Sequence, residues 1–583
     1  MQTTVKELQD LFKQATLEAF PGLLPQADEI PFEVVQSTQE KFGHYQYNTA
    51  MKLAKPLGLT PRNIAEAIVK QVNTPDMIAK MEIAGPGFIN ITLQPSYISQ
   101  NLTAHLRDLR LGIPLPKKPQ NIVIDFSSPN VAKEMHVGHL RSTIIGDSLA
   151  RLYEFLGHKV LRLNHIGDWG TAFGMLIAYM KQEAPEVLTG NQHTDLTHLV
   201  SWYKASKLRF DNDPAFKKQS QLEVVSLQSG DPESLKAWGI ICEISRKAYQ
   251  EIYDLLNVHL EERGESYYNS VLGDVVKDLE NRGIVTLSDG AKCIFIEGFQ
   301  NREGEPLPLM IQKSDGGYNY DTTDMAAIKH RLEDEQADHL IYVTDAGQSI
   351  HFQMIFKAAE LAGYLDPKRV RVDHVPFGLV LGADGKKFKT RSGDTERLID
   401  LLTTAVDHAK QIFRERSPEL PEEEVDTLSK ALGISAVKYA DLSCNRTGDY
   451  TFSYERMLKF EGNTAAFLMY SYVRVNGIKR KVHADVDALI PQNSIQVGHP
   501  SEIALGVHLL QFAEALEFMA KDLLPNRLTD YLYGLAEKFN AFFRDCRVEG
   551  SEEEVPRLLL CELTARTLRT GMDILGLRLV ERM

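Results

Sequence analysis

The sequence predicts a multidomain α/β protein in which a parallel sheet with helices on its faces follows a small α+β domain and precedes an all-α region. Residues 121–126 and 160–163 are apolar, β-branched runs on either side of an amphipathic helical pattern, which indicates a βαβ unit. Strand patterns at residues 292–297, 307–312, 339–343 and 369–375 are expected to continue the same sheet, with helices over residues 323–335 and 351–361. From residue 396 onward nearly every segment has helical periodicity.

Length and composition set the broad class. The 583 residues suffice for roughly four domains, and 43% apolar residues is ordinary for a globular protein. The net charge of −14 does not exclude a polyanionic partner, because binding depends on where Lys and Arg cluster. The five cysteines form no C-x-x-C pair, so we expect reduced thiols and no structural zinc. We expect a soluble, cytoplasmic protein with no membrane partner, because no apolar run reaches membrane-spanning length.

The main chemical motif lies at the start of the helix between the first two strands. His136, Gly138 and His139 stand at its first turn, where backbone N–H groups and the helix dipole favour an anion. Gly138 allows close approach, and the two imidazoles can donate hydrogen bonds to phosphate oxygens. Lys133 adds a positive charge beside them. Taken alone, a His-x-Gly-His string fits helix capping or packing about equally well.

The surrounding sequence is more specific. SSPNVAKEMHVGHLRST, continuing through LNHIGDWGTAFGMLI, resembles the signature of arginyl-tRNA synthetases, a family of class I aminoacyl-tRNA synthetases. The resemblance includes the Ser-Ser-Pro-Asn opening, the Ala-Lys step and a tetrad of the HIGH type, and it extends over nearly the whole chain. It implies a Rossmann-like catalytic domain that is split by an insertion around residues 180–290.

The resemblance implies an enzyme that ligates L-arginine to tRNA(Arg). Arginine and ATP would form arginyl-adenylate and pyrophosphate, and the terminal ribose of the tRNA would then take the arginyl group. The expected catalytic residues are His136, His139 and Lys133, with Gly138 also binding ATP and Mg²⁺ accompanying the nucleotide. Members of this family usually need bound tRNA before they activate arginine, and we expect the same here. A monomer with no DNA partner is also expected.

The arginine site that the resemblance implies is spread over several motifs. A guanidinium group needs fixed carboxylates and polar acceptors in one plane. The matching positions are Asp125, Asn130, His136, Tyr320, Asp324 and Gln348. Asp324 is the preferred partner of the guanidinium group. Asp321, in contrast, is expected to be a helix N-cap.

A second phosphate-binding element is expected in the basic, glycine-bounded loop of residues 384–393. Such a loop alone is more often a solvated turn, but after the sheet it resembles the KMSKS loop of class I synthetases. Lys387 takes the place of the first lysine and Thr390 that of the second, and the resemblance makes Lys133 the substitute for the missing charge. The candidates for ATP binding in this loop are Lys387, Lys389 and Arg391.

Both ends of the chain resemble tRNA-binding parts of the family. We expect a tRNA-contacting domain at residues 1–115, the catalytic domain at 116–395, a helical connection at 396–455 and an anticodon-binding domain at 456–583. The expected tRNA contacts are Tyr45, Gln46, Asn48, Arg474 and Met583. A polar domain surface with buried tyrosines explains the first three equally well. The apolar stripe between Leu528 and Phe543 is interpreted as core, not as a base-stacking platform.

Two other classes of function need to be distinguished from this one. A small-molecule nucleotidyltransferase shares the tetrad and the fold but has no use for the two terminal regions. A non-catalytic tRNA-binding module would be expected to have lost the tetrad or the pocket, and both are intact. The missing zinc-ligand cluster disfavours a cysteine-specific synthetase.

Overall fold

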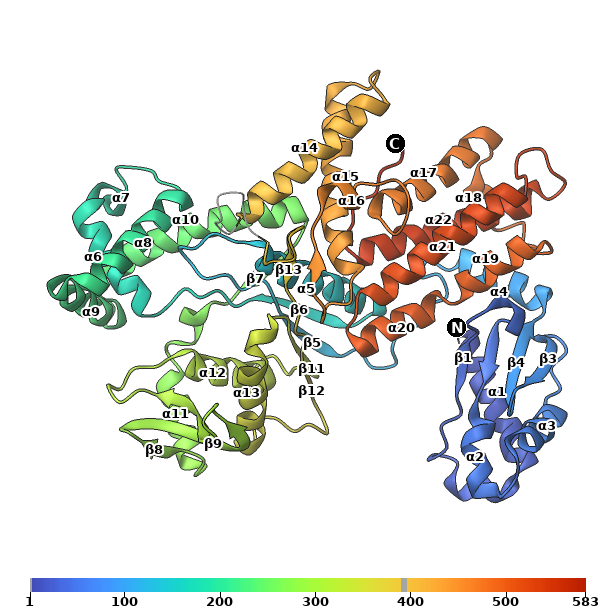
Figure 1. The fold of residues 1–583 in the computed structure, drawn as a ribbon, viewed down its shortest axis with the longest axis horizontal. Coiled ribbons are helices and arrows are strands. Elements are labelled where there is room, and N and C mark those ends of the chain that lie inside the picture. Colours follow the sequence, from blue (N-terminus) through green and yellow to red (C-terminus); the bar gives the residue numbers. More distant parts are fainter. Residues whose placement is uncertain (1–2, 389–395) are drawn as a thin grey trace. The chain divides into compact units, whose positions relative to one another are not determined.

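The computed structural model of the chain describes residues 3–388 and 396–583, which form two compact units. Unit 1 consists of Met1–Leu115, Lys459–Asp573 and Leu579–Met583, and unit 2 consists of Pro116–Leu458 and Ile574–Arg578. Figure 1 shows the elements of both units. The short segment Ile574–Arg578 returns from the end of the last helix to pack in unit 2.

Unit 2 is built on a five-stranded parallel sheet with the strand order β12-β11-β5-β6-β7. The chain proceeds from β5 to β6 and β7 on one side, and it later adds β11 and β12 on the other side. Ligands of such sheets bind outside the carboxyl ends of the strands, where the strand order reverses. Here the reversal lies between β5 and β11. The strands are β5 (Asn121–Asp125), β6 (Lys159–Asn164), β7 (Glu261–Glu262), β11 (His339–Tyr342) and β12 (Arg371–His374).

Helices cover both faces of this sheet. Figure 1 shows α12 and α13 together on one face and α5 on the other. The core on the first face joins Val123, Leu163 and Leu340 of the strands to Met325 and Ile355 of the helices. On the other face, a Cβ added to Gly146 would lie 2.2 Å from the Phe126 ring, so α5 packs directly against the end of β5. The helices are α5 (Val137–Leu156), α11 (Leu272–Asn281), α12 (Tyr320–Glu333) and α13 (Ser349–Leu361).

A helical insertion separates β6 from β7. Its small core contains Met175, Ala178 and Phe216. Gly174 allows two of its helices to pack closely, because a Cβ there would lie 2.3 Å from the Val224 side chain. The helices are α6 (Thr171–Glu183), α7 (Pro185–Thr189), α8 (Leu196–Asn212), α9 (Pro214–Gln228) and α10 (Pro232–Leu256).

The strands predicted at residues 292–297 and 307–312 do not belong to the parallel sheet. They are β9 (Ala291–Gln300) and β10 (Pro306–Gln312), which pair antiparallel in a separate sheet with β8 (Thr286–Ser288). The turn between β9 and β10 is closed by a hydrogen bond from Asn301 N to Glu305 O (2.8 Å). So short a connection makes a hairpin, because parallel neighbours require a crossover of a dozen or more residues.

Buried charged side chains join the remainder of unit 2 to α5 and to the segment Ile574–Arg578. Arg141 of α5 pairs with Asp441 at 3.1 Å, and both side chains are almost fully buried. Lys438 donates to the backbone oxygens of Leu256 (2.6 Å) and Gly576 (2.7 Å), which fastens the segment Ile574–Arg578. The elements are β13 (Val380–Leu381), α14 (Leu398–Arg416), α15 (Glu422–Leu442), β14 (Tyr450–Thr451) and α16 (Tyr454–Met457).

Unit 1 begins with a four-stranded antiparallel sheet in the order β1-β2-β4-β3. The predicted alternation of β4 is present, with Ile89, Ile91 and Leu93 buried, although Asn90 is also buried. The strands are β1 (Val34–Gln36), β2 (Tyr45–Tyr47), β3 (Ile78–Ala84) and β4 (Phe88–Leu93), and the helices are α1 (Thr4–Ala19), α2 (Thr49–Leu57), α3 (Pro61–Gln71) and α4 (Pro95–Arg107).

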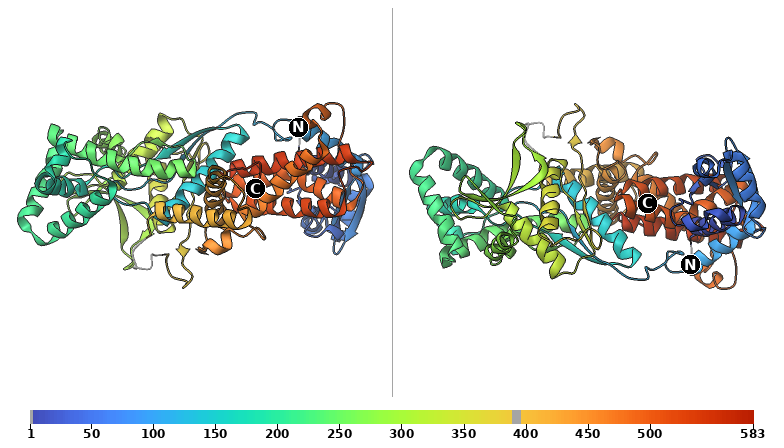
Figure 2. Two further views of the ribbon diagram at one scale, coloured as in Figure 1. Left: turned by 90° about the horizontal axis from the view of Figure 1, so that it is seen from above. Right: turned by 90° about the horizontal axis from the view of Figure 1, so that it is seen from below.

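A helical bundle completes unit 1. Figure 2 shows its helices, coloured orange to red, side by side. One stretch, Pro500–Asp522, is apolar and long enough to span a membrane, but 67% of its most apolar window is buried. The helices are α17 (Ala465–Val482), α18 (Val486–Leu489), α19 (Pro500–Leu510), α20 (Phe512–Asp522), α21 (Asn526–Asp545) and α22 (Glu554–Ile574).

Candidate functional site

The loop that joins β5 to α5 is held in a costly backbone conformation. Ser127, Ser128 and Ala132 have positive φ angles of 72°, 48° and 59°. Such angles cost a residue with a side chain roughly 1–3 kcal/mol and persist only where neighbouring groups enforce them. Here the N–H of Ser127 donates to Ser142 Oγ and that of Ser128 to Asn164 Oδ1, each at 2.9 Å. The strained loop lies at the reversal of the strand order, where a ligand site is expected.

The two histidines of the tetrad cap α5 with one ring nitrogen each. His136 Nδ1 accepts a hydrogen bond from the N–H of Gly138, and His139 Nδ1 accepts one from the N–H of His136, both at 3.1 Å. A nitrogen that accepts a hydrogen bond carries no proton, so in each neutral ring the proton lies on Nε2. The fold therefore selects the tautomer in which Nε2 is a donor.

Burial keeps both rings neutral. It lowers the pKa of His136, and the charge of Lys387 lowers it further. At His139, burial and then the charges of His136 and Lys133 lower the pKa to about 3. Both side chains are thus uncharged hydrogen-bond donors at neutral pH.

The structure changes the expected source of phosphate donors at this turn. The N–H groups of His136 and Gly138 are occupied by imidazole nitrogens, so they are not the open helix-start donors that we expected. Capping and phosphate binding are nevertheless compatible at these histidines, because capping uses Nδ1 and leaves Nε2–H to donate.

Both described ends of the basic loop approach the histidine turn. Lys387 pairs with Leu381 in an isolated bridge, which forms a hairpin after β13, and its charge acts on His136. On the far side of the loop, His136 forms an isolated bridge with Arg397. Lys389 and Arg391 lie outside the described residues. Among the described residues of this loop, Lys387 is therefore the one whose charge acts on His136.

Lys133 lies near the other histidine of the turn. Its charge acts on His139, and its exposed ammonium group lies 5.7 Å from the centroid of the Tyr203 ring in helix α8 of the insertion. Each imidazole of the turn therefore has one lysine whose charge acts on it, Lys387 for His136 and Lys133 for His139.

Carboxylates gather around Asp324 of α12. One oxygen, Oδ2, receives a hydrogen bond from His351 Nε2 at 2.6 Å, and the other, Oδ1, lies 3.8 Å from His165 Nε2. Burial, followed by the charges of Asp324 and Asp168, raises the pKa of Glu265 to about 7. Neighbouring carboxylates repel one another and favour a cation placed between them. This cluster of carboxylates therefore suits a positively charged ligand.

Glu265 was missed by the sequence analysis. It follows β7, which has only two residues, Glu261–Glu262, and so gives no recognisable apolar run. Its position after β7 could have identified it, because ligands of parallel sheets bind at the carboxyl ends of the strands.

Asp125 lies beneath the strained loop, and both of its oxygens are occupied. Oδ2 pairs with buried Arg331 at 2.7 Å, and Oδ1 accepts from Ser128 Oγ at 2.9 Å. Within the protein, Arg331 therefore balances the charge of this carboxylate and Ser128 donates a hydrogen bond to it.

Of the other predicted arginine-binding residues, Tyr320 contacts the carboxylate cluster, whereas Gln348 and Asn130 have neighbours outside it. Tyr320 is 61% exposed, and its ring meets the ring of His351 edge to face at 5.2 Å. Gln348 is exposed and donates to Asp345 at 3.1 Å. Asn130 is exposed next to Gly167, where a Cβ would lie 2.1 Å from its side-chain oxygen.

The N-cap assigned to Asp321 was wrong. Asn319 caps α12, accepting a hydrogen bond from the N–H of Thr322 at 3.4 Å. Asp321 instead accepts from the N–H of Met310 (3.0 Å) and faces His351 Nδ1 at 3.4 Å.

In the N-terminal region, the predicted stacking residue Tyr45 is fully buried. Its hydroxyl donates to Glu514 at 2.7 Å, so its ring cannot stack on a base as this unit is folded. Gln46 is half-buried and donates to Asn90 at 2.8 Å. The side-chain oxygen of Asn48 is buried and has no hydrogen-bond partner within the described part of the chain.

Arg474 lies at a pocket of about 420 Å³ between α17 and α21. Its guanidinium carbon lies 4.8 Å from the Tyr470 ring centre and 5.1 Å from that of Phe543, and Nη1 donates to Asn540 at 2.6 Å. Tyr470 is 41% and Phe543 42% exposed, so the core interpretation was wrong for Phe543. The lining residues are Tyr470, Val473, Arg474, Gly477, Ile478, Lys481, Phe543, Arg544, Cys546, Arg547, Val548 and Glu549.

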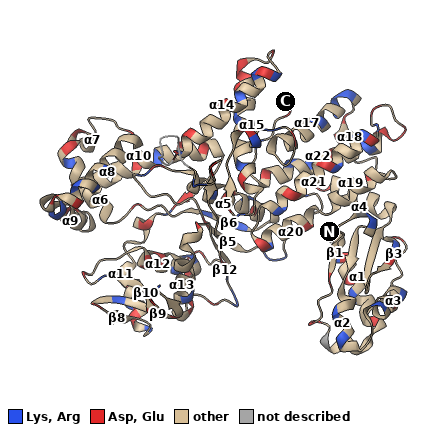
Figure 3. Cartoon of the chain, viewed as in Figure 1, with Lys and Arg blue, Asp and Glu red and all other residues tan. Residues whose placement is uncertain are grey.

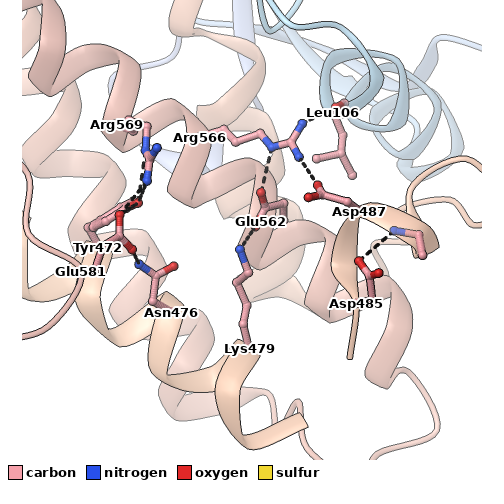
Figure 4. Close-up of polar contacts among 11 residues, drawn as sticks. Leu106, Tyr472, Asn476, Lys479, Asp485, Asp487, Glu562, Arg566, Arg569 and Glu581 are labelled. Atoms are coloured by element: carbon pink, nitrogen blue, oxygen red, sulfur yellow. Dashed lines mark hydrogen bonds and ion pairs between the residues drawn. The ribbon is translucent and has the colours of Figure 1, made fainter. Parts of the chain in front are cut away.

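Ion pairs fix the neighbouring helices and the chain end. The last turn of α17 is basic (Figure 3), but Lys479 there is paired with Glu562 at 2.6 Å (Figure 4). Glu581 receives hydrogen bonds from Asn476 (2.7 Å) and Arg569 (2.8 Å). These contacts hold the segment that ends at Met583 against α17 and α22.

Three family models match the chain. The model described as "tRNA synthetases class I (R), catalytic domain" matches residues 101–454. The "DALR anticodon binding domain" matches residues 468–583, and the "Arginyl tRNA synthetase N terminal domain" matches residues 6–93.

Relatives match over the full chain. The arginine–tRNA ligase of Protochlamydia amoebophila (strain UWE25) is 65% identical over 584 residues, 100% of both chains. That of Chlamydia felis (strain Fe/C-56) is 53% identical over 581 residues, again 100% of both. The crystal structure of arginyl-tRNA synthetase from Plasmodium falciparum matches with a TM-score of 0.86 at 34% identity, covering 100% of both chains. The chain therefore belongs to the arginyl-tRNA synthetase family of class I aminoacyl-tRNA synthetases.

Proposed function

We propose that this chain is an arginine–tRNA ligase, which activates L-arginine with ATP and transfers it to the terminal ribose of tRNA(Arg). The observation that carries the proposal is the pairing of two sites at one edge of the parallel sheet. Neutral imidazole donors stand beside lysines at the start of α5, and a carboxylate pocket suited to a cation surrounds Asp324. ATP and arginine require such a combination.

The phosphate-binding part acts by positioning and by charge. His136 and His139 would donate Nε2–H to phosphate oxygens, while Lys133 and Lys387 neutralise the charge that moves onto the leaving pyrophosphate. Lys389 and Arg391 remain candidates for the same role. The arginine carboxylate is itself the nucleophile, so the protein needs none of its own.

Mg²⁺ would be held mainly by the nucleotide. Within residues 3–388 and 396–583, no group of three or more His, Cys, Asp or Glu side chains could hold a metal ion. This fits Mg²⁺ that binds through phosphates and water and keeps few protein ligands. When bound, the ion would screen the phosphate charge.

Asp324 and Glu265 would bind the guanidinium group of arginine. Two carboxylates can accept hydrogen bonds from its planar fork. Tyr320, Gln348, Asn130 and His136 would contact the remainder of the substrate, and Asp125 would support the loop from below.

The pocket around Arg474 would receive a nucleotide of the anticodon loop, because aromatic rings and a guanidinium group provide stacking surfaces. Residues 456–583 would then be the anticodon-binding domain, ending near the tRNA at Met583, and residues 1–115 a further tRNA-contacting domain with Gln46 and Asn48. We also propose that arginine activation requires bound tRNA and that the enzyme is a cytoplasmic monomer.

Pyrophosphate exchange into ATP tests the activity. We expect exchange with arginine alone among the amino acids, and only when tRNA is present. Exchange with arginine at equal rates with and without tRNA would contradict the coupling. No exchange with any amino acid would contradict the proposed function and favour a binding module.

The pH dependence of the KM for arginine tests Glu265. Because its pKa is raised to about 7, Glu265 is largely protonated below that pH and must lose a proton to bind guanidinium. We expect the KM to fall as pH rises from 6 toward 8, by at most about tenfold per unit, and then to level off. Glu265→Gln should raise the KM at pH 8 and abolish the slope, whereas an unchanged slope in that variant would contradict the assignment.

Phe543→Ala tests the pocket in unit 1. Loss of a stacked base costs about 1–3 kcal/mol, so the Kd for tRNA(Arg) should rise by roughly 5- to 150-fold while Phe543→Tyr stays near wild type. Phe518→Ala, at a 50% exposed phenylalanine outside the pocket lining, is the matched control. Equal losses of affinity in Phe543→Ala and Phe518→Ala would remove the pocket from tRNA binding.

A further inference from the structure

His351 lies between two carboxylates of the neighbouring helix. Helices α12 and α13 pack side by side on one face of the sheet (Figure 1), and His351 of α13 faces α12. Its Nε2 is 2.6 Å from Asp324 Oδ2, and its Nδ1 is 3.4 Å from Asp321 Oδ1. Each ring nitrogen thus faces a carboxylate of α12.

This geometry requires a doubly protonated ring. An ionised carboxylate only accepts hydrogen bonds, and a neutral imidazole has one donor, so both contacts are favourable only in the imidazolium form. Burial alone would lower the pKa of His351, but the hydrogen bonds to Asp321 and Asp324 outweigh it and raise the pKa to about 9. A fixed positive charge therefore lies behind the pocket at neutral pH.

The surroundings keep the ring and both carboxylates in place. The rings of Tyr320 and Phe352 meet His351 edge to face, each at 5.2 Å. The second oxygen of Asp321 is held by the N–H of Met310 at 3.0 Å. Asp321 is thus held by the backbone and serves as an anchor. The imidazolium of His351, which contacts both carboxylates, fixes the position of Asp324 relative to Asp321.

Because His351 occupies one oxygen of the Asp324 carboxylate, the other oxygen is the one presented to a ligand. Oδ2 is held by His351, while Oδ1 faces His165, and the charge of Asp324 acts on Glu265. Without the imidazolium, Asp321 and Asp324 would be like charges one turn apart on α12, and Asp324 would be free to rotate away from Glu265.

We propose that His351 is a positioning residue for arginine: it clamps Asp324 to Asp321 so that one carboxylate edge is presented to the guanidinium group in a fixed orientation. This inference rests on the proposed function. A planar fork of N–H donors gains from a carboxylate whose direction is set, whereas the compact ammonium group of lysine adapts to many directions. The clamp therefore favours arginine over lysine as well as strengthening its binding.

Two substitutions separate the two contacts. Glutamine places its amide nitrogen near the position of Nε2 and can still donate to Asp324, whereas asparagine reaches only the position of Nδ1, towards Asp321. We expect His351→Asn to raise the KM for arginine about tenfold or more in tRNA-dependent pyrophosphate exchange, with kcat and the KM for ATP within about twofold of wild type. His351→Gln, which keeps the contact to Asp324 but loses the one to Asp321, should recover only part of the loss. The ratio of kcat/KM for arginine to that for lysine should fall in His351→Asn and recover in part in His351→Gln.

The wild-type enzyme separates failure of this inference from failure of the proposed function. Absence of arginine-dependent exchange in the wild type refutes the function itself. With exchange present, equal effects of His351→Asn and His351→Gln, or losses confined to kcat and the KM for ATP, overturn the clamp. Thermal unfolding of both variants identifies a folding defect. If His351→Asn does not fold, a wild-type KM and selectivity in Asp321→Ala, which removes the acceptor that faces His351 Nδ1, overturns the clamp, because the anchor would then be dispensable.

Discussion

The hydrogen bonds between two imidazoles and the backbone at the start of α5 are the constraint on which the site depends. By accepting the N–H groups of Gly138 and His136, the two Nδ1 atoms fix the rings as neutral Nε2–H donors. A charged imidazole would bind phosphate more strongly in the ground state and would also repel the nearby lysines. Neutral donors that need no reorganisation suit a reaction in which charge shifts between phosphate oxygens.

The rest of unit 2 holds this turn in place. The loop before α5 is strained at Ser127 and Ser128, and it is retained because side chains from α5 and β6 occupy its N–H groups. Arg331 beneath the loop neutralises Asp125. On the opposite face, His351 and Asp321 fix Asp324. In each case a buried ion pair or hydrogen bond orders a residue that lies at the reversal of the strand order.

Local patterns sufficed to predict the centre of the fold. Residues 121–164 were assigned correctly because strand, loop and helix signals lie within one short stretch. Three features depended on distant or weak signals. Tyr45 is buried and its hydroxyl donates to Glu514, which lies far along the chain, so the local sequence could not show its burial. Glu265 follows a strand too short to be recognised. Phe543 belongs to an apolar stripe, and only packing shows that its ring reaches the pocket of Arg474. The hairpin of β9 and β10, in contrast, could have been predicted from the length of its turn.

The central claim is that the two histidines act as neutral donors of fixed tautomer. ¹⁵N NMR of the imidazole nitrogens, with His136→Asn and His139→Asn to assign the signals, tests it directly. The account predicts a protonated Nε2 and an unprotonated Nδ1 in both rings from pH 7 to 8, because burial lowers both pKa values and that of His139 to about 3. Imidazolium signals, or a proton on Nδ1 of either ring in this range, would contradict it.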